Sequence, residues 1–304
     1  MTSCCETLGL DSAQCASGLA RLGQATFDAA VCNSTIVHTN KATPSGLRFR
    51  VSGLDMKQKV QAELAHDRWS GGSELRRMHA TYLATKCITI LDIGANLGIF
   101  AVFAYKLLSK RFHCLRVLSI EPLPETHFFL RANLRGNNVL ESSSEELRSS
   151  ASSSAGVVHS SSARASPWSG VRALNLALTS DGREVNFAVG TRSMTAHETS
   201  TRVARKTLQW DAIGGVGDAR RNDHTSRGTH RVGGGGVGAV PSPDGFRHYS
   251  VASTTLEGLL DDHNVSSVDL MKLDCEGCEY EMLRELRAKP LLAQRIASVA
   301  GEVP

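Results

Sequence analysis

The sequence lacks any apolar run long enough to cross a membrane. A membrane-spanning helix needs about 20 consecutive apolar residues, and the 304-residue chain contains no such run. Its N-terminal segment carries Glu6 and Asp11 and has neither a basic start nor a continuous apolar stretch, so it does not resemble a secretory signal. We therefore expect a soluble protein with no membrane partner, and the cytoplasm is the favoured compartment.

An excess of charge of one sign is also missing. The chain has 34 Lys and Arg against 30 Asp and Glu, a formal net charge of +4, and the basic residues are scattered along it. Surfaces that bind nucleic acid gather Lys and Arg on one face or stripe. The composition therefore gives no support to a nucleic-acid partner.

The paired Cys and His spacing of a zinc site is absent as well, and no metal site is expected. Of the eight cysteines, Cys87, Cys114, Cys275 and Cys278 lie in or beside predicted strands, where we expect reduced thiols packed in or near the core. Cys275 and Cys278 also have the CxxC spacing of a redox pair, but they fall within a longer pattern described below.

Two stretches have the composition of disordered chain. Residues near 141–170 are dominated by serine, and residues near 197–247 include the run Gly233 to Gly236. Such stretches bury too little apolar area to offset the entropy lost on ordering. We expect disordered surface insertions within one domain over residues 56–304, because interdomain linkers would separate pieces too short to fold alone. Residues 1–55 carry no interpretable motif and stay unassigned.

Elsewhere, short β-rich apolar runs alternate with segments of helical period. The expected strands are 87–93, 115–120, 171–178, 184–189, 268–273 and 296–303, and the expected helices are 97–108, 125–134, 255–262 and 278–288. A turn at 180–182 should join the third and fourth strands. This alternation predicts an α/β fold with a mainly parallel, doubly wound sheet, whose ligands bind at the carboxyl ends of the strands.

A glycine-rich turn follows the first of these strands. In LDIGANLG, Gly94 and Gly98 permit a tight turn and close approach of a ligand to the backbone, while Asp92 can orient the loop or a ligand amine. Taken alone, the same residues also suit a simple strand-to-helix connection.

An acid ends the second strand. Glu121 lies where a carboxylate can accept hydrogen bonds from both ribose hydroxyls of a nucleoside cofactor, although a solvated strand-end carboxylate is the plainer interpretation. The turn GANLG lacks the full GxGxxG that approaches a pyrophosphate. It suits S-adenosylmethionine, which has no phosphate, better than NAD(P), which remains the alternative cofactor.

Charged residues alternate along a later apolar strand and follow its end. Lys272 and Asp274 share one strand face, and Glu276 comes two residues further on. A charge inside such a strand is costly unless it is paired or functional. Pairing of Lys272 with Asp274 is the structural alternative to a catalytic role.

Four segments together resemble the successive motifs of the FkbM-type methyltransferases: LDIGANLGIFAVFAY, IEPLPETHFFLRANL, NLALTSDGREVNFAV and TTLEGLLDDHNVSSVDLMKLDCEGCEYEML. They cover roughly residues 85–140, 171–195 and 249–304. The resemblance implies a Rossmann-like class I methyltransferase fold. It further implies S-adenosyl-L-methionine as cofactor and O-methylation of a hydroxyl on a sugar, glycan or natural-product acceptor.

The same resemblance assigns roles to individual residues. Asp92, Gly94, Asn96, Gly98 and Glu121 match positions of the cofactor site. The DxEG segment places Asp274 and Glu276 near the methyl group and the acceptor, with Lys272 beside them. Cys275 and Cys278 stand where small or apolar residues are usual, which favours packing over redox chemistry.

The chain departs from the family pattern at its end. That pattern continues past the fifth strand, with a histidine soon after the glutamate, whereas this chain stops at Pro304. We therefore expect the sheet to lack its last strands.

The sequence as a whole leaves three functions open. In order of preference they are an active O-methyltransferase, a catalytically inactive domain of the same fold that only binds its ligand, and an NAD(P)-dependent oxidoreductase.

Overall fold

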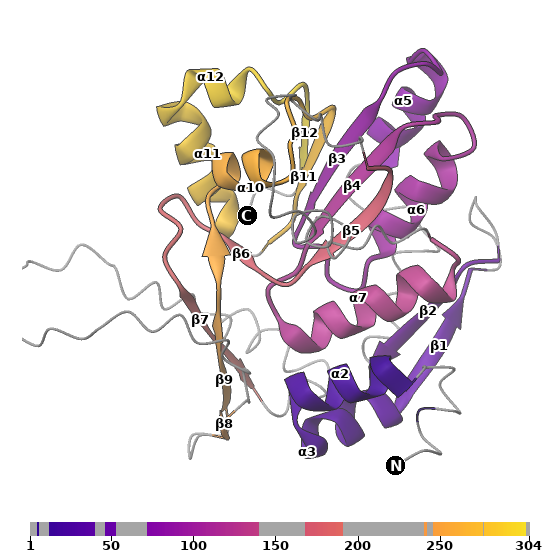
Figure 1. Cartoon of the computed structure of the whole chain (residues 1–304), viewed down its shortest axis with the longest axis vertical. Helices are drawn as coiled ribbons and strands as arrows, with labels where there is room; N and C mark the ends of the chain where they lie inside the picture. The colour runs from indigo at the N-terminus through magenta and orange to yellow at the C-terminus, as the bar shows by residue number, and fades with distance from the viewer. Residues whose placement is uncertain are drawn as a thin grey trace, which may run out of the picture.

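A parallel sheet of five strands forms the centre of the protein (Figure 1). The computed structural model describes residues 5, 12–39, 46–52, 72–139, 168–190, 240–241, 246–275 and 277–301. The strands run in the spatial order β12-β11-β3-β4-β5, and each neighbouring pair is parallel. Their bounds are β3 Ile88–Ile93, β4 Leu115–Ile120, β5 Gly170–Leu174, β11 Leu270–Leu273 and β12 Val299–Gly301. The predicted α/β fold with a mainly parallel sheet is confirmed.

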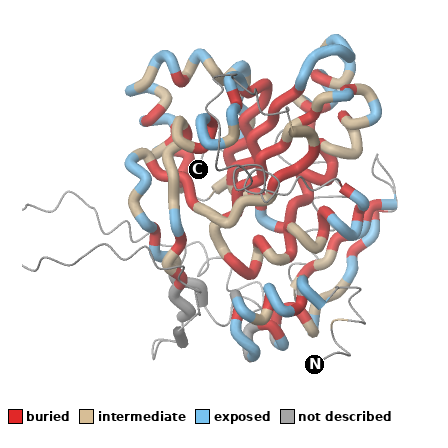
Figure 2. The backbone as a smooth tube through the Cα atoms, viewed as in Figure 1, coloured by how far each residue is buried: buried red, intermediate tan, exposed pale blue. Residues whose placement is uncertain are grey.

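Helices cover both faces of this sheet. Ile88 and Ile90 of β3 pack into one hydrophobic cluster, whereas Leu91 and Ile93 pack into another, because successive side chains of a strand point to opposite faces. The first cluster contains α5 Gly72–Thr81, α6 Ile99–Leu108 and α7 Pro124–Gly136; the second contains α10 Leu256–Asp262, α11 Cys278–Ala288 and α12 Pro290–Ala293. Figure 2 shows the resulting buried centre.

Burial on both faces explains why the central strands were easy to recognise. Every residue of β3 is buried, and so are five of the six residues of β4. Strands of this kind appear in a sequence as nearly continuous apolar runs. The predicted elements 87–93, 97–108, 115–120, 125–134, 255–262, 268–273 and 278–288 accordingly agree with the observed ones to within about two residues at each end.

The described part of residues 1–55 packs onto helix α7. It consists of α2 Ser12–Leu22, α3 Gln24–Phe27, the π-helix η1 Asp28–Cys32 and the hairpin β1 Ser34–His38 with β2 Arg48–Ser52. Asn133 of α7 and Asn137, the residue that caps its carboxyl end, bind the backbone of β2 as a neighbouring strand would. The Asn133 amide accepts from the Arg50 N–H at 2.5 Å and donates to the Arg50 carbonyl at 3.1 Å. Asn137 does the same to Arg48, at 2.8 and 2.6 Å.

The strand expected over 171–178 is divided between two sheets. Its first part is β5, and its second part is β6 Ala177–Leu178, which pairs in parallel with β10 Ser253–Thr254. Between them, the Asn175 side chain donates to the backbone carbonyls of Glu121 and Pro122 at 3.0 and 2.8 Å. Since these bonds hold the chain against the end of β4, β5 stops there and the following residues join another sheet.

The turn predicted at 180–182 does lie between the third and fourth expected strands, but these two strands belong to different sheets. The fourth expected strand is present as β7 Val185–Gly190, but it pairs antiparallel with β9 Phe246–Val251, which in turn pairs with β8 Val240–Pro241. Residues 141–167 and 191–239 lie outside the described residues, so the expected disorder there stays a prediction. Over the described ranges, no helix is long and apolar enough to cross a membrane.

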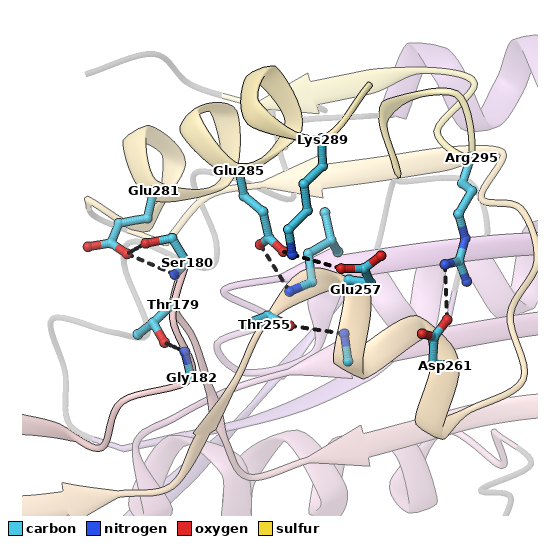
Figure 3. Close-up of polar contacts among 12 residues, drawn as sticks. Thr179, Ser180, Gly182, Thr255, Glu257, Asp261, Glu281, Glu285, Lys289 and Arg295 are labelled. Carbon is cyan, nitrogen blue, oxygen red and sulfur yellow. Dashed lines mark hydrogen bonds and ion pairs between the residues drawn. The ribbon is translucent and has the colours of Figure 1, made fainter. Parts of the chain in front are cut away.

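A set of polar contacts fixes helix α11 beside α10 and the 180–182 turn (Figure 3). Glu281 of α11 accepts hydrogen bonds from the Ser180 backbone N–H and hydroxyl at 2.9 and 2.8 Å. The buried Glu285 accepts from the Leu256 N–H at the start of α10 at 3.1 Å. Thr255 caps the same end of α10 by accepting from the Gly258 N–H at 3.0 Å. The bonds of Glu281 and Glu285 hold α11, which begins at Cys278, against its neighbours.

Candidate functional site

A pocket opens at the carboxyl ends of β3, β4 and β11. Strand β3 comes first along the chain but lies inside the sheet, between β4 and β11. The later strands β4 and β5 are added on one side of it, and β11 and β12 on the other. Such a switch point leaves a crevice at the strand ends. Gly94 and Asn96 after β3, Glu121 after β4 and Asp274 after β11 all line the pocket. Three positions far apart in sequence therefore meet in one cavity, as the sequence predicted.

The rest of the pocket wall is mainly apolar. Phe187 comes from β7, and Leu176 and Ala177 come from the segment that leaves the parallel sheet after β5. Sequence reasoning missed these residues because it placed them in strands without indicating which sheets those strands join. The apolar lining consists of Ile93, Ile120, Leu123, Leu176, Leu178 and Phe187.

The glycine-rich turn adopts a backbone that favours glycine. Gly94, Asn96 and Gly98 have φ angles of 76°, 49° and 79°, in the left-handed region that side chains with a Cβ disfavour. A Cβ on Gly94 would lie 2.0 Å from the backbone oxygen of Asp274. Gly94 thus lets the end of β11 approach the turn. Gly98 packs against Leu130 instead and is not among the pocket-lining residues.

Glu121 connects this turn to the pocket. One carboxylate oxygen accepts from the Asn96 N–H and the other from the Leu123 N–H, both at 2.9 Å. Burial raises the pKa of Glu121 to about 7, although these two N–H donors act in the opposite direction. Each carboxylate oxygen can accept more than one hydrogen bond, so Glu121 can also accept hydrogen bonds from a ligand.

An ion cluster of Lys272, Asp92 and Asp274 adjoins the pocket. Lys272 is the neighbour of Asp92 in the register of β11 and β3. Its Nζ lies 3.3 Å from Oδ1 of Asp92 and 3.4 Å from Oδ2 of Asp274. The pairing of Lys272 with Asp274, the structural alternative considered from the sequence, is present, and Asp92 is a second partner that the sequence did not reveal. Asp92 is fully buried and, like Lys272, does not line the pocket.

The charges of this cluster influence one another. Burial raises the pKa of the Asp92 carboxyl, and the neighbouring Lys272 partly offsets that effect. Burial alone would lower the pKa of Lys272, but the charges of Asp92 and Asp274 reverse this and raise it. Lys272 therefore stays protonated at neutral pH and is unsuited to accept a proton. Asp274, whose side chain is 43% exposed, is the member that reaches the pocket.

The family model for the methyltransferase FkbM domain matches residues 92–302, more than half of the chain. The chain belongs to the FkbM methyltransferase family. No curated protein and no solved structure matches it in the corresponding comparisons. The matched range contains Gly94, Glu121 and Asp274, so the pocket lies within the FkbM domain. Glu276, the other carboxylate of the DxEG segment, lies outside the described residues.

The four cysteines in or beside the predicted strands are paired, so the expectation of reduced thiols is wrong. Cys87 is bonded to Cys114, and Cys275 to Cys278, with Cα atoms 4.5 and 5.5 Å apart. Cys87 and Cys114 directly precede the paired residues Ile88 of β3 and Leu115 of β4. Strand register therefore brings them together, which cysteine spacing alone could not indicate. No described residue group resembles a metal site.

Substituting Gly94 with alanine tests the turn. We expect Gly94→Ala to lower the free energy of unfolding by at least about 1–2 kcal/mol. Position 94 has a left-handed backbone, which a residue with a Cβ disfavours, and the new Cβ would also collide with the Asp274 carbonyl. Gly136→Ala is the matched control, since Gly136 has open space around it and lies in a helix. Urea unfolding of both variants makes the comparison. Equal stabilities would show that the turn does not need glycine at position 94.

Substituting Lys272 with methionine tests the ion cluster. We expect Lys272→Met to lose about 3–5 kcal/mol, because buried Asp92 keeps no compensating charge. A carboxyl whose folded pKa is raised contributes stability at low pH and loses it as pH rises through that pKa. The deficit, measured by urea unfolding, should therefore be larger at pH 8 than at pH 5. Exposed Lys110→Met is the control, with an expected change within about 0.5 kcal/mol. A deficit independent of pH would contradict the cluster.

Proposed function

We propose that this FkbM-family protein is an S-adenosylmethionine-dependent O-methyltransferase with a Rossmann-like class I fold, acting on a hydroxyl of a sugar or other small-molecule acceptor. The observation that carries the proposal is the meeting of Glu121, the Gly94 turn and Asp274 in one pocket at the sheet's switch point. The strand order, 3-2-1-4-5 from one edge, also suits a nucleoside-binding doubly wound sheet.

The residues of the pocket fit the proposed cofactor. Glu121 has acceptor capacity left for the ribose hydroxyls, and Ile120 and Leu123 beside it offer an apolar wall to an adenine ring. The turn from Gly94 brings backbone close to the remainder of the ligand. When bound, S-adenosylmethionine supplies an electrophilic methyl group on a sulfonium. NAD(P) is disfavoured because GANLG lacks the full GxGxxG of the pyrophosphate fingerprint.

The proposed acceptor side centres on Asp274. An acceptor hydroxyl must lose its proton during methyl transfer, and a carboxylate within hydrogen-bond reach can take it. Asp274 is half-exposed to the pocket, and Lys272 lies 3.4 Å from it. We assign proton acceptance or acceptor orientation to Asp274 and a positioning role to Lys272. Glu276 remains a candidate for the same work on the sequence pattern alone.

Binding of S-adenosylhomocysteine by calorimetry tests the cofactor site. Because Glu121 has a pKa of about 7 and hydroxyl donors prefer the carboxylate, affinity should rise about tenfold from pH 6 to pH 8. Glu121→Gln keeps the shape of the side chain, and we expect it to weaken binding at pH 8 and to abolish this pH dependence. Failure of the folded wild-type protein to bind at any pH would overturn the cofactor assignment.

Turnover of Asp274→Asn tests the acceptor side. We expect methyl transfer to fall by about 100-fold or more while S-adenosylhomocysteine affinity is retained, because the amide cannot accept the proton. Formation of S-adenosylhomocysteine with a panel of monosaccharide and glycoside acceptors provides the readout. Exposed Asp262→Asn is the control. Full turnover by Asp274→Asn would remove Asp274 from the mechanism. Tight cofactor binding with no turnover on any acceptor by wild type would instead favour an inactive binding domain.

A further inference from the structure

A disulfide forms part of the pocket wall. Cys275 and Cys278 are bonded to each other, and both line the pocket together with Asp274. The methyl transfer proposed above uses oxygen and nitrogen atoms of the protein to bind and position its ligands. The two cysteine sulfur atoms have no role in it. The pair nevertheless lies next to the carboxylate that we assign to the acceptor.

The two cysteines differ in accessibility. Cys275 is partly exposed, whereas Cys278 is buried and is the first residue of α11. The backbone at Cys275 also packs closely against the glycine-rich turn, because a Cβ on Gly94 would lie 2.9 Å from the Cys275 Cα. The cross-link therefore joins the segment that touches the turn to the start of a helix.

The backbone around the pair is held independently of the sulfur–sulfur bond. Buried Glu279 accepts hydrogen bonds from the Cys275 N–H at 2.7 Å and from the Gly277 N–H at 2.6 Å. Further along α11, Glu281 and Glu285 fasten the helix to its neighbours. Breaking the disulfide should therefore alter the pocket wall while the fold around it remains.

We propose that Cys275 and Cys278 are a redox-active pair, and that their dithiol or disulfide state sets the affinity of the pocket for the adenosyl cofactor. This inference rests on the proposed function for its ligand. A thiolate of a dithiol reductant attacks the accessible Sγ of Cys275. The bond to Cys278 breaks, and Cys278 leaves as a thiolate at the first turn of α11, where the helix dipole favours negative charge.

The second thiol of the reductant completes the exchange. It attacks the reductant's own sulfur in the mixed disulfide and expels Cys275 as a thiolate. The reductant becomes a cyclic disulfide, and its two electrons and two protons end on the cysteine pair. No other oxidant or reductant is needed.

The disulfide state is the one that should bind the cofactor more tightly. Reduction replaces one covalent bond by two separate thiols, which need more room than the bonded pair, so at least one side chain of the pocket wall must move. Reduction also leaves the Cys275 and Cys278 side chains free to change rotamer. We expect S-adenosylhomocysteine affinity to fall by about tenfold on reduction, because a side chain of the wall that gains freedom must be ordered again when the ligand binds.

Calorimetry with S-adenosylhomocysteine, on oxidised protein and on protein kept in dithiothreitol, measures this effect. Alkylation and intact mass count the thiols opened in each sample. The Cys275→Ser/Cys278→Ser double variant should bind with one affinity under both conditions. The matched control is Cys87→Ser/Cys114→Ser, which removes a disulfide at the amino ends of β3 and β4 and away from the pocket lining. This control should keep the redox-dependent difference.

The outcomes separate the two proposals. A redox-dependent affinity that is lost only in the Cys275/Cys278 double variant supports the inference. Equal affinity in both states of the wild type, with the pair shown by mass to open, overturns the redox control and leaves the proposed function standing. A pair that dithiothreitol does not open likewise overturns it. Absence of binding in both states overturns the proposed cofactor site, and the redox control of its affinity falls with it.

Discussion

One buried ammonium group holds the centre of this structure together. Lys272 lies between Asp92 on the neighbouring strand and Asp274 at the end of its own strand. Removing the Asp92 carboxylate and the Lys272 ammonium from water is costly, and the cost is offset only when their mutual geometry is fixed. The cluster favours one register of β11 against β3 over its alternatives. That register in turn places the Asp274 backbone against Gly94 and the Asp274 side chain at the pocket.

The pocket depends on this alignment in a second way. The close approach of β11 to the turn leaves no space for a side chain at Gly94. The same turn directs the Asn96 N–H to Glu121, which also binds the N–H of Leu123 at the start of α7. Three strand ends are thus linked through backbone groups and one carboxylate. A ligand that bonds to Glu121 therefore meets a site arranged before it arrives, which limits the entropy lost on binding.

The disulfides add a constraint of a different kind. The described cysteines include three bonded pairs, Cys5 with Cys15, Cys87 with Cys114, and Cys275 with Cys278. That pattern is typical of proteins that fold in oxidising compartments, whereas the cytoplasm favoured by the sequence stays a prediction. Cys87 and Cys114 connect two strands of the core, whereas Cys275 and Cys278 face the pocket. One disulfide therefore cross-links the central sheet, and another lies in the wall of the proposed binding pocket.

The sequence by itself determined the elements whose character is local. Fully buried strands are apolar throughout and their neighbours have helical period, so β3, β4, β11, α6, α7, α10 and α11 could be recognised together with the α/β class. The glycine turn, Glu121 and Asp274 could be placed because the carboxyl ends of parallel strands meet at one edge. The order of the four quoted segments identified the FkbM family, which the family match confirmed.

Only the tertiary structure decided what depends on partners distant in sequence. No local pattern indicated that Asp92 pairs with Lys272, that Phe187 closes the pocket from an antiparallel sheet, or that the chain over 171–178 divides at Asn175. The pairing of Cys87 with Cys114 likewise follows from the register of two adjacent strands. Burial and period are set by each residue and its near neighbours, whereas pairing depends on which strands become adjacent when the whole chain folds.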